Sequence, residues 1–448
     1  MAQVPTAQAP VRIGSARRRA FRFEGWWGAA LLLLLVACPL WQMHVHNHSM
    51  RSSYSDLIAR WVGTRAALAG SDPYSNQVLR EMQRAYYGHY PLTAADPNPE
   101  RVGFFYPAHL VVLLAPLAYF PWQTARWIFL SVTLLLLLLG FWGCIQMYPP
   151  RYTRGQIAIV LVLSVCNWPV LWGLRLQQPT LLVAAFIFLG CFCLSRGSGS
   201  VAGVLFALAT VKPQIVLPIL AWLFLWAIAN RVWNFFFSFG ITLAALLLCT
   251  EWLVPHWISR WRASLHIYVQ VTDTAPALEN LFGHWVGLVL TVLIAGSICL
   301  SLWRLRRCSA NSAEFSVAVS LALALTVMVT PTHLAIIYNQ VLLFPACLFL
   351  IYVTPANRDS RIARWGALAL LVLTFALTPA AVLAEAVLKP SIVWGAMPFF
   401  SNSPMSGGIA MAMAIIVSHA LKPSPDETRY PAPLRTLLVP TGANTPGE

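Results

Sequence analysis

The chain of 448 residues carries a formal net charge of +15, yet only 10% of its residues are charged and 58% are hydrophobic. Soluble globular proteins carry roughly 25% charged residues, so a mainly water-soluble chain is excluded. The basic residues stand in short clusters between apolar runs, which is typical of cytoplasmic loops in membrane proteins and argues against a nucleic-acid-binding protein. We therefore predict an all-α polytopic membrane protein, surrounded by membrane lipids and with no nucleic-acid partner.

Apolar segments, each a candidate transmembrane helix, follow one another along the chain. They span residues 26–43, 105–120, 126–147, 157–174, 180–194, 201–211, 214–229, 232–253, 283–303, 314–330, 334–353, 365–386 and 405–421. Four arginines between 17 and 22 precede the first segment, but no small-residue cleavage site follows it. We therefore expect an uncleaved helix rather than a signal peptide.

Lys and Arg in the short loops predict the orientation of these segments. Basic residues before the first segment, around 304–307 and 358–364, and at Lys422 favour both termini in the cytoplasm. We expect the protein in the plasma membrane. Four stretches then lie outside: 44–104, 254–282, 331–333 and 387–404. The segments 105–120 and 201–229 stay open, because each can cross the membrane or enter and return. Either alternative gives about twelve crossings.

This pattern predicts three parts of the chain. Residues 1–25 form a cytoplasmic N-terminal segment, and residues 26–421 form one transmembrane domain whose first outer loop is 44–104. The tail 422–448 is rich in Pro, Thr and charge, and we predict that it is disordered. The nine cysteines lie within or beside apolar segments, so neither a disulfide framework nor a zinc site is expected. No cofactor is expected, and a divalent metal ion stays open.

The first candidate for chemistry is Asp56, directly after the first apolar segment. Ionisable groups beside the membrane core are costly and are candidates for function. A carboxylate here can take a proton from an incoming hydroxyl as a general base. The alternative is a solvated loop acid or a helix N-cap.

A short amphipathic helix is expected after Asp56. Leu57, Trp61 and Leu68 give the following residues an apolar side that suits the membrane surface. The turn Gly70-Ser71-Asp72-Pro73-Tyr74 then ends this helix, because Gly terminates helices and an Asp before Pro is extended. Asp56 would stand at the start of the helix and Asp72 after its end.

The second candidate is Lys212 with Pro213, in a segment that has no other charged residue. Proline breaks a helix and frees backbone donors, while the lysine places a positive charge near hydrocarbon. This combination suits the phosphate of a lipid. The alternative is a lysine that snorkels from a helix end to the membrane surface.

Two polar turns are further candidates. The turn from Gln177 to Thr180 is uncharged and able to hydrogen-bond hydroxyl groups. His333, in a turn on the outer face ahead of Tyr338, could hydrogen-bond a sugar or a phosphate, or could be structural.

These motifs stand in a definite order along residues 50–350. Asp56-Leu57 is followed by Gly-x-Asp-Pro-Tyr at 70–74, Phe105-Tyr106-Pro107, Leu114-Ala115-Pro116-Leu117-Ala118, Gln178-Pro179-Thr180, Ala207 through Lys212-Pro213, and Pro331…Tyr338-x-x-Val341-Leu342-Leu343. The ordered set resembles glycosyltransferase family 87. Two positions depart from the family's pattern: Gln177 stands where Gly usually precedes the Gln, and Asn339 stands where an Asp often follows the Tyr.

The resemblance implies a GT-C fold, with many transmembrane helices and a catalytic acid in a helical first outer loop. It also implies inverting transfer of a mannose-like sugar, or of arabinofuranose, from a polyprenyl-phosphate donor to a lipid or glycan acceptor outside the cell. Asp56 would be the catalytic base, and Lys212 would neutralise the donor phosphate. The remaining candidates for donor or substrate binding are Asp72, Tyr74, Arg175, Gln178, His333 and Tyr338.

Two functions without catalysis stay open. A lipid or glycolipid transporter or flippase often has broken helices at mid-membrane, and the break at Lys212-Pro213 is compatible with that. The lack of internal symmetry and the acid-bearing first outer loop favour the enzyme. A structural partner in an envelope-assembly complex is the other alternative.

Overall fold

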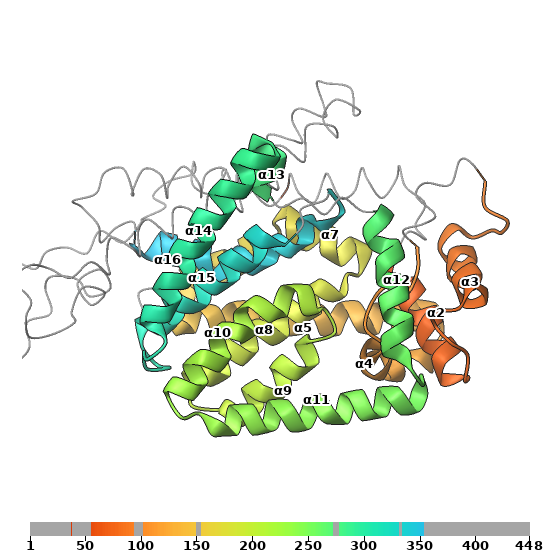
Figure 1. Cartoon of the computed structure of the whole chain (residues 1–448), viewed down its shortest axis with the longest axis horizontal. Coiled ribbons are helices and arrows are strands. Elements are labelled where there is room, and N and C mark those ends of the chain that lie inside the picture. Colours follow the sequence, from red (N-terminus) through yellow and green to blue (C-terminus); the bar gives the residue numbers. More distant parts are fainter. Residues whose placement is uncertain are drawn as a thin grey trace, which may run out of the picture.

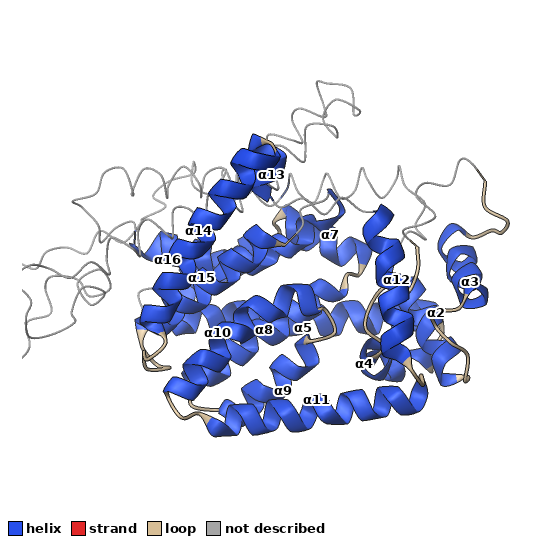
Figure 2. Ribbon diagram, viewed as in Figure 1, coloured by secondary structure: helices blue, strands red, loops and turns tan. Residues whose placement is uncertain are grey.

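The structure is a computed structural model that describes residue 37 and residues 55–93, 102–148, 154–271, 277–330 and 334–353. All regular secondary structure in these ranges is helical (Figure 2). The predicted first outer loop contains α2 (Asp56–Leu68) and α3 (Asn76–Tyr87). The helices that follow are α4 (His109–Ala118), α5 (Trp122–Met147), α6 (Arg154–Val165), α7 (Trp168–Leu176), α8 (Pro179–Ser195), α9 (Gly199–Ala209), α10 (Pro213–Ala229), α11 (Trp233–Leu253), α12 (Trp257–Val271), α13 (Ala277–Phe282), α14 (His284–Leu305), α15 (Ala313–Val329), the 3-10 helix η2 (Leu334–Leu343) and α16 (Phe344–Val353).

The helices form one bundle, with α2 and α3 at one end (Figure 1). Helices α2, α3, α4 and α12 gather at that end, and the long α11 runs along one edge of the bundle. Helix α8 packs against α5 and α9, while α15 packs against α10, α14 and α16. The contacts of η2 with α7, α8 and α15 bring the last described part of the chain to the centre of the bundle.

Three described helices are long and apolar enough to cross a membrane: α5 with 26 residues, α11 with 21 and α14 with 22. The bent pair α6–α7, with an angle of 55° between its helices, raises the number to four if it is one span. Apolar side chains on the long helices face outward, among them Trp127, Leu135, Phe237, Ile241, Leu248, Val289 and Leu293. The described part of the chain is therefore all-helical and has apolar helices suited to a membrane protein, as predicted, although these residues do not reach about twelve spans.

The predicted apolar segments in the described ranges are helical, and their observed bounds differ from the predicted bounds by a few residues. Residues 157–174 differ, because Asn167 starts a new helix there: its side-chain oxygen accepts the Val170 backbone N–H at 3.1 Å, and Pro169 lies in the first turn. The stretch 254–282, which was predicted to lie outside, contains α12 and α13, and the sequence analysis missed both helices. The segments 26–43, 365–386 and 405–421 lie outside the described residues.

The two open segments are both interrupted. Helix α4 has ten residues, a length of about 15 Å, and cannot by itself cross a hydrocarbon core of roughly 30 Å. Residues 201–229 form α9 and α10, which are separated by Thr210, Val211 and Lys212. This break, expected from Pro213, carries polar groups into the bundle.

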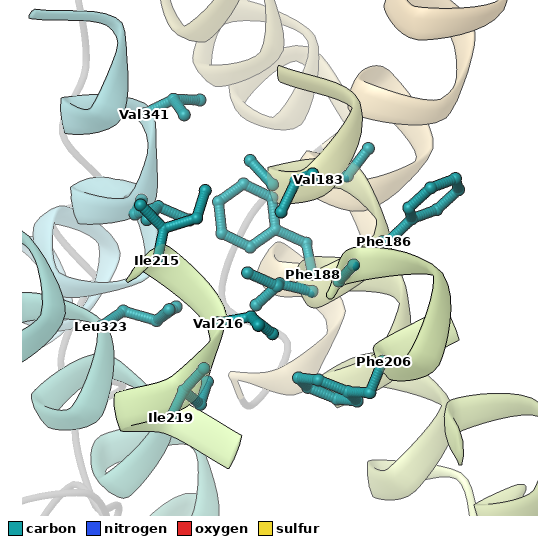
Figure 3. Close-up of a cluster of buried hydrophobic side chains, with 14 of the residues drawn as sticks. Val183, Phe186, Phe188, Phe206, Ile215, Val216, Ile219, Leu323 and Val341 are labelled. Carbon is teal, nitrogen blue, oxygen red and sulfur yellow. The ribbon is translucent and has the colours of Figure 1, made fainter. Parts of the chain in front are cut away.

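Helix α8 is the centre of the apolar core. Its side chains are buried on nearly all sides, as expected for a helix surrounded by others. Val183, Phe186 and Phe188 of α8 belong to a cluster of buried apolar side chains that also includes residues of α9, α10, α15 and η2 (Figure 3). Those labelled in the figure are Phe206, Ile215, Val216, Ile219, Leu323 and Val341. This core fixes the N-terminal end of α8 and, with it, the polar turn at Gln178.

Helices α9 and α11 approach closely at Gly203, as small residues allow in membrane proteins. A Cβ atom on Gly203 would lie 2.6 Å from the Phe235 carbonyl oxygen and 2.7 Å from the Phe239 backbone nitrogen. Because both atoms belong to the backbone, the helices would have to separate.

We expect Gly203→Ala to destabilise the purified protein by about 1–3 kcal/mol, the usual cost of overpacking. Gly240→Ala in α11 is the matched control, because a Cβ there meets no atom within 4 Å. It should be neutral or stabilise the protein by up to about 1 kcal/mol through helix propensity. Thermal unfolding in detergent measures both, and equal melting temperatures would contradict the close packing of α9 on α11.

Candidate functional site

Asp56 stands in the first turn of α2, as predicted, but it is not the N-cap. Ser55 caps the helix: its Oγ accepts the Leu57 backbone N–H at 3.2 Å. The same hydroxyl donates to Oε1 of Gln177, which ties the start of α2 to the turn after α7. The carboxylate of Asp56 is thus held at the N-terminal end of a helix, where the helix dipole favours negative charge.

Arg60 lies one helical turn after Asp56 and points to the same side. Its Nη1 lies 3.9 Å from Oδ1 of Asp56 and also donates to the Asp56 carbonyl oxygen. The guanidinium lies over the ring of Tyr106, 5.1 Å from its centre. The Nε atom is buried and has no hydrogen-bond partner. Sequence analysis missed Arg60, although the spacing of four residues from Asp56 on a helix was a usable signal.

The polar turn between α7 and α8 is buried. Gln177 adopts a left-handed backbone conformation with φ of 52°, which ends α7 and favours glycine. This geometry explains why the family's pattern has Gly here. In this chain, the Gln177 side chain adds the link to Ser55. Gln178 follows with its side chain near two phenols, as a hydrogen-bond partner of Tyr338 and 3.5 Å from the Tyr106 hydroxyl.

Lys212 occupies the break between α9 and α10, immediately before Pro213, and is 4% exposed. Its Nζ donates to the hydroxyl of Thr180 and, at 3.3 Å, to Oδ1 of Asn339. It also lies 4.8 Å from the centre of the Tyr338 ring. The alternative of a snorkelling lysine is wrong, because the ammonium points into the bundle. Its hydrogen-bond partners are neutral, and among the described residues no carboxylate lies within ion-pair distance.

Asp56, Arg60 and Lys212 belong to one electrostatic cluster. Desolvation raises the pKa of Asp56 above its ordinary value, while the positive charges of Arg60 and Lys212 oppose that rise. The phenols of Tyr106, Tyr268 and Tyr338 complete the surroundings, since each acts electrostatically on Asp56, on Arg60 or on another of the phenols. Four predicted residues therefore meet in one place: Asp56, Gln178, Lys212 and Tyr338.

Two other predicted residues lie at the border of this cluster and shape the loop. Oδ1 of Asp72 accepts the Tyr74 backbone N–H at 3.0 Å, and Oδ2 lies 3.3 Å from Arg260 of α12. The Tyr74 hydroxyl donates to the Tyr106 carbonyl oxygen at 2.7 Å. Asp72 thus orients Tyr74, and Tyr74 holds the backbone of Tyr106. In these contacts both residues have a structural role.

Arg175 and His333 are the remaining predicted residues. Arg175 is in the last turn of α7, 5.2 Å from the centre of the Trp172 ring, and its part in donor or substrate binding stays a prediction. His333 lies outside the described residues. Across the part of the chain that the structure describes, no three His, Cys, Asp or Glu side chains gather in a way that could hold a metal ion.

Comparison with known proteins identifies the family of the chain. No curated protein and no solved structure matches the chain. The model of glycosyltransferase family 87 matches residues 104–331, just over half of the chain. The matched range contains Tyr106, Gln178 and Lys212, which line the cluster from three different elements. The chain belongs to glycosyltransferase family 87.

Proposed function

We propose that this glycosyltransferase moves a mannose-like sugar from a polyprenyl-phosphate donor to a lipid or glycan acceptor. The reaction inverts the anomeric centre and takes place on the outer face of the plasma membrane, with both termini of the chain in the cytoplasm. The observation that carries the proposal is the meeting of one carboxylate with two buried cations in a protein of apolar helices. An acid–base reaction on an anionic, lipid-linked substrate uses these groups.

Asp56 acts as the base in this proposal. It takes the proton of the acceptor hydroxyl while the acceptor oxygen forms a bond to the anomeric carbon. The bond from that carbon to the phosphate oxygen breaks at the same time, and polyprenyl monophosphate leaves with the bonding electrons. The 3.9 Å distance to Arg60 Nη1 exceeds a hydrogen bond, so the carboxylate oxygens stay available for the acceptor.

Lys212 binds the donor phosphate in this proposal. A phosphodiester carries one negative charge and the leaving monophosphate gains a second, so a fixed cation favours the transition state over the bound donor. The neutral partners Thr180 and Asn339 orient the ammonium without neutralising it. The first turn of α10 begins at Pro213, and its free N–H groups add to the attraction for an anion.

We expect Asp56→Asn to reduce kcat by about 10²–10⁴, the usual contribution of a general base. Because burial disfavours the ionised carboxylate, the neutral amide should leave the melting temperature unchanged or raise it. A transfer assay with labelled polyprenyl-phosphate mannose and purified protein measures the rate. Glu81→Gln, an exposed acid of α3, is the control and should keep full activity. Near-normal transfer by Asp56→Asn would exclude Asp56 as the base.

The raised pKa of Asp56 predicts the pH dependence of the reaction. A base must be ionised, so kcat/KM should be constant at neutral pH and fall as the pH drops through a value above the ordinary ~4 of aspartate. The same shift favours the protonated side chain in the folded state, so this residue's contribution to stability is lost as the pH rises through that value. Initial rates across the pH range give the acidic limb of kcat/KM. If kcat/KM falls only below the ordinary pKa of aspartate, the raised pKa of Asp56 is contradicted.

We expect Lys212→Ala to raise KM for the donor by about tenfold or more, since it removes a charge-assisted hydrogen bond. Lys212→Arg should keep part of the affinity because it keeps the charge. Competition by the donor's own polyprenyl monophosphate separates donor binding from acceptor binding. An unchanged KM in a folded Lys212→Ala protein would show that Lys212 does not bind the phosphate.

A further inference from the structure

Arg60 is a second buried cation beside Lys212. The roles proposed for Asp56 as the base and Lys212 as the phosphate ligand do not explain why it is there. The residue is only 8% exposed, although arginine is almost never buried unless it is paired. Lys212 acts electrostatically on the same carboxylate. Two cations therefore face one carboxylate, and the cluster has an excess of positive charge before any substrate enters.

Arg60 has a side-chain hydrogen bond with Tyr106, but its contacts leave the Nε donor of the guanidinium unused. Nη1 serves the carbonyl oxygen of Asp56 and approaches its carboxylate only to 3.9 Å. Nε is buried without a hydrogen-bond partner, whereas buried polar groups are normally hydrogen-bonded. A guanidinium also has the planar donor geometry that matches phosphate oxygens. An anion is the ligand that would satisfy both the charge and the free donor.

We propose that Arg60 is a second cationic ligand of the donor phosphate, and that it partners Asp56 in the empty site until this phosphate arrives. The inference rests on the proposed function for the class of donor. When the phosphate binds, the guanidinium pairs with it and interacts less with the carboxylate of Asp56. Asp56 then meets the acceptor hydroxyl as a stronger base, so that proton removal is tied to the presence of the donor.

The charge balance of the reaction fits two cations. The phosphodiester enters with one negative charge, and cleavage of the bond to the anomeric carbon leaves two negative charges on the monophosphate. The proton of the acceptor goes to Asp56, which becomes neutral. Arg60 and Lys212 are then free to neutralise the leaving group. Both cations therefore bind the phosphate most strongly when the bond to the anomeric carbon breaks.

The first test is binding of a short isoprenoid phosphate to the full-length protein in detergent. Citronellyl phosphate and uncharged citronellol differ only at the head group. We expect Arg60→Gln to weaken binding of citronellyl phosphate by about tenfold or more and to leave citronellol unchanged, with Arg60→Lys in between. Arg65→Gln is the matched control, because Arg65 is exposed on the same helix and lies against Trp61. It should behave as the wild type.

The second test is the separation between the acidic limbs of kcat and kcat/KM, because an arginine that does not bind the phosphate would shift both limbs equally. The groups around Asp56 are Arg60 of α2, Lys212 before α10, and the phenols of Tyr106, Tyr268 and Tyr338. The acidic limb of kcat, which reports the loaded enzyme, should lie at higher pH than the limb of kcat/KM, which reports the free enzyme. The difference in pH between the two limbs should persist in Arg60→Lys, because lysine retains the charge. This difference should become smaller in Arg60→Gln.

Unchanged binding of citronellyl phosphate by a folded Arg60→Gln protein would overturn the inference. Equal losses for the phosphate and the alcohol would overturn it too, because they indicate a role in packing. If Arg60→Gln does not fold, Arg60→Lys decides, since a ligand of the phosphate must lose affinity when the fork of donors is removed. A wild type that transfers no sugar from any polyprenyl-phosphate donor would reject the proposed function, while the binding test would still decide the part of Arg60.

Discussion

Charge is costly among apolar helices, and this protein gathers Asp56, Arg60 and Lys212 in one cluster. The two cations are buried, and desolvation raises the pKa of the carboxylate despite both of them. Such an arrangement lowers stability unless water, hydrogen bonds or a ligand compensate. Here the compensation within the described residues is partial, since Lys212 has neutral hydrogen-bond partners and the Arg60 Nε has none. The excess of positive charge makes an anionic substrate the natural complement of the site.

The fold serves this cluster by interrupting helices where polar groups are needed. Ser55 starts α2, Gln177 ends α7 in a left-handed conformation, and Pro213 starts α10. Each interruption exposes backbone groups that a continuous helix would satisfy, which membrane proteins tolerate inside the protein. The apolar core around α8 holds the three interruptions together, while the long helices α5, α11 and α14 turn apolar side chains outward. A lipid-linked donor could therefore keep its chain in the bilayer and its phosphate in the site.

Sequence reasoning found most of the helices because hydrophobic length dominates in a membrane protein. It also found α2 and the break at Lys212-Pro213, which depend on local signals. It missed α12, because fifteen residues with Arg260, Arg262 and His266 do not read as a span, and their support comes from contacts with the loop before α4: the Trp261 indole donates to the Phe105 carbonyl oxygen at 3.0 Å. The site was found only in part. Asp56 and Lys212 stand out by type and place. Arg60 could have been found from its spacing of four residues after Asp56, whereas the hydrogen bond between Asn339 and Lys212 joins residues far apart in the sequence.

The central claim is that the cluster around Asp56 receives the phosphate of a lipid-linked sugar donor. The most direct test is an experimental structure of the full-length protein with a non-hydrolysable polyprenyl-phosphate sugar in a lipid nanodisc. The measured quantities are the distances from the phosphate oxygens to Lys212 Nζ and from the Asp56 carboxylate to the acceptor side of the anomeric carbon. The account predicts a hydrogen bond between the phosphate and Lys212, with Asp56 on the opposite face of the sugar from the phosphate. A phosphate bound away from Lys212, with Asp56 facing no part of the sugar, would contradict it.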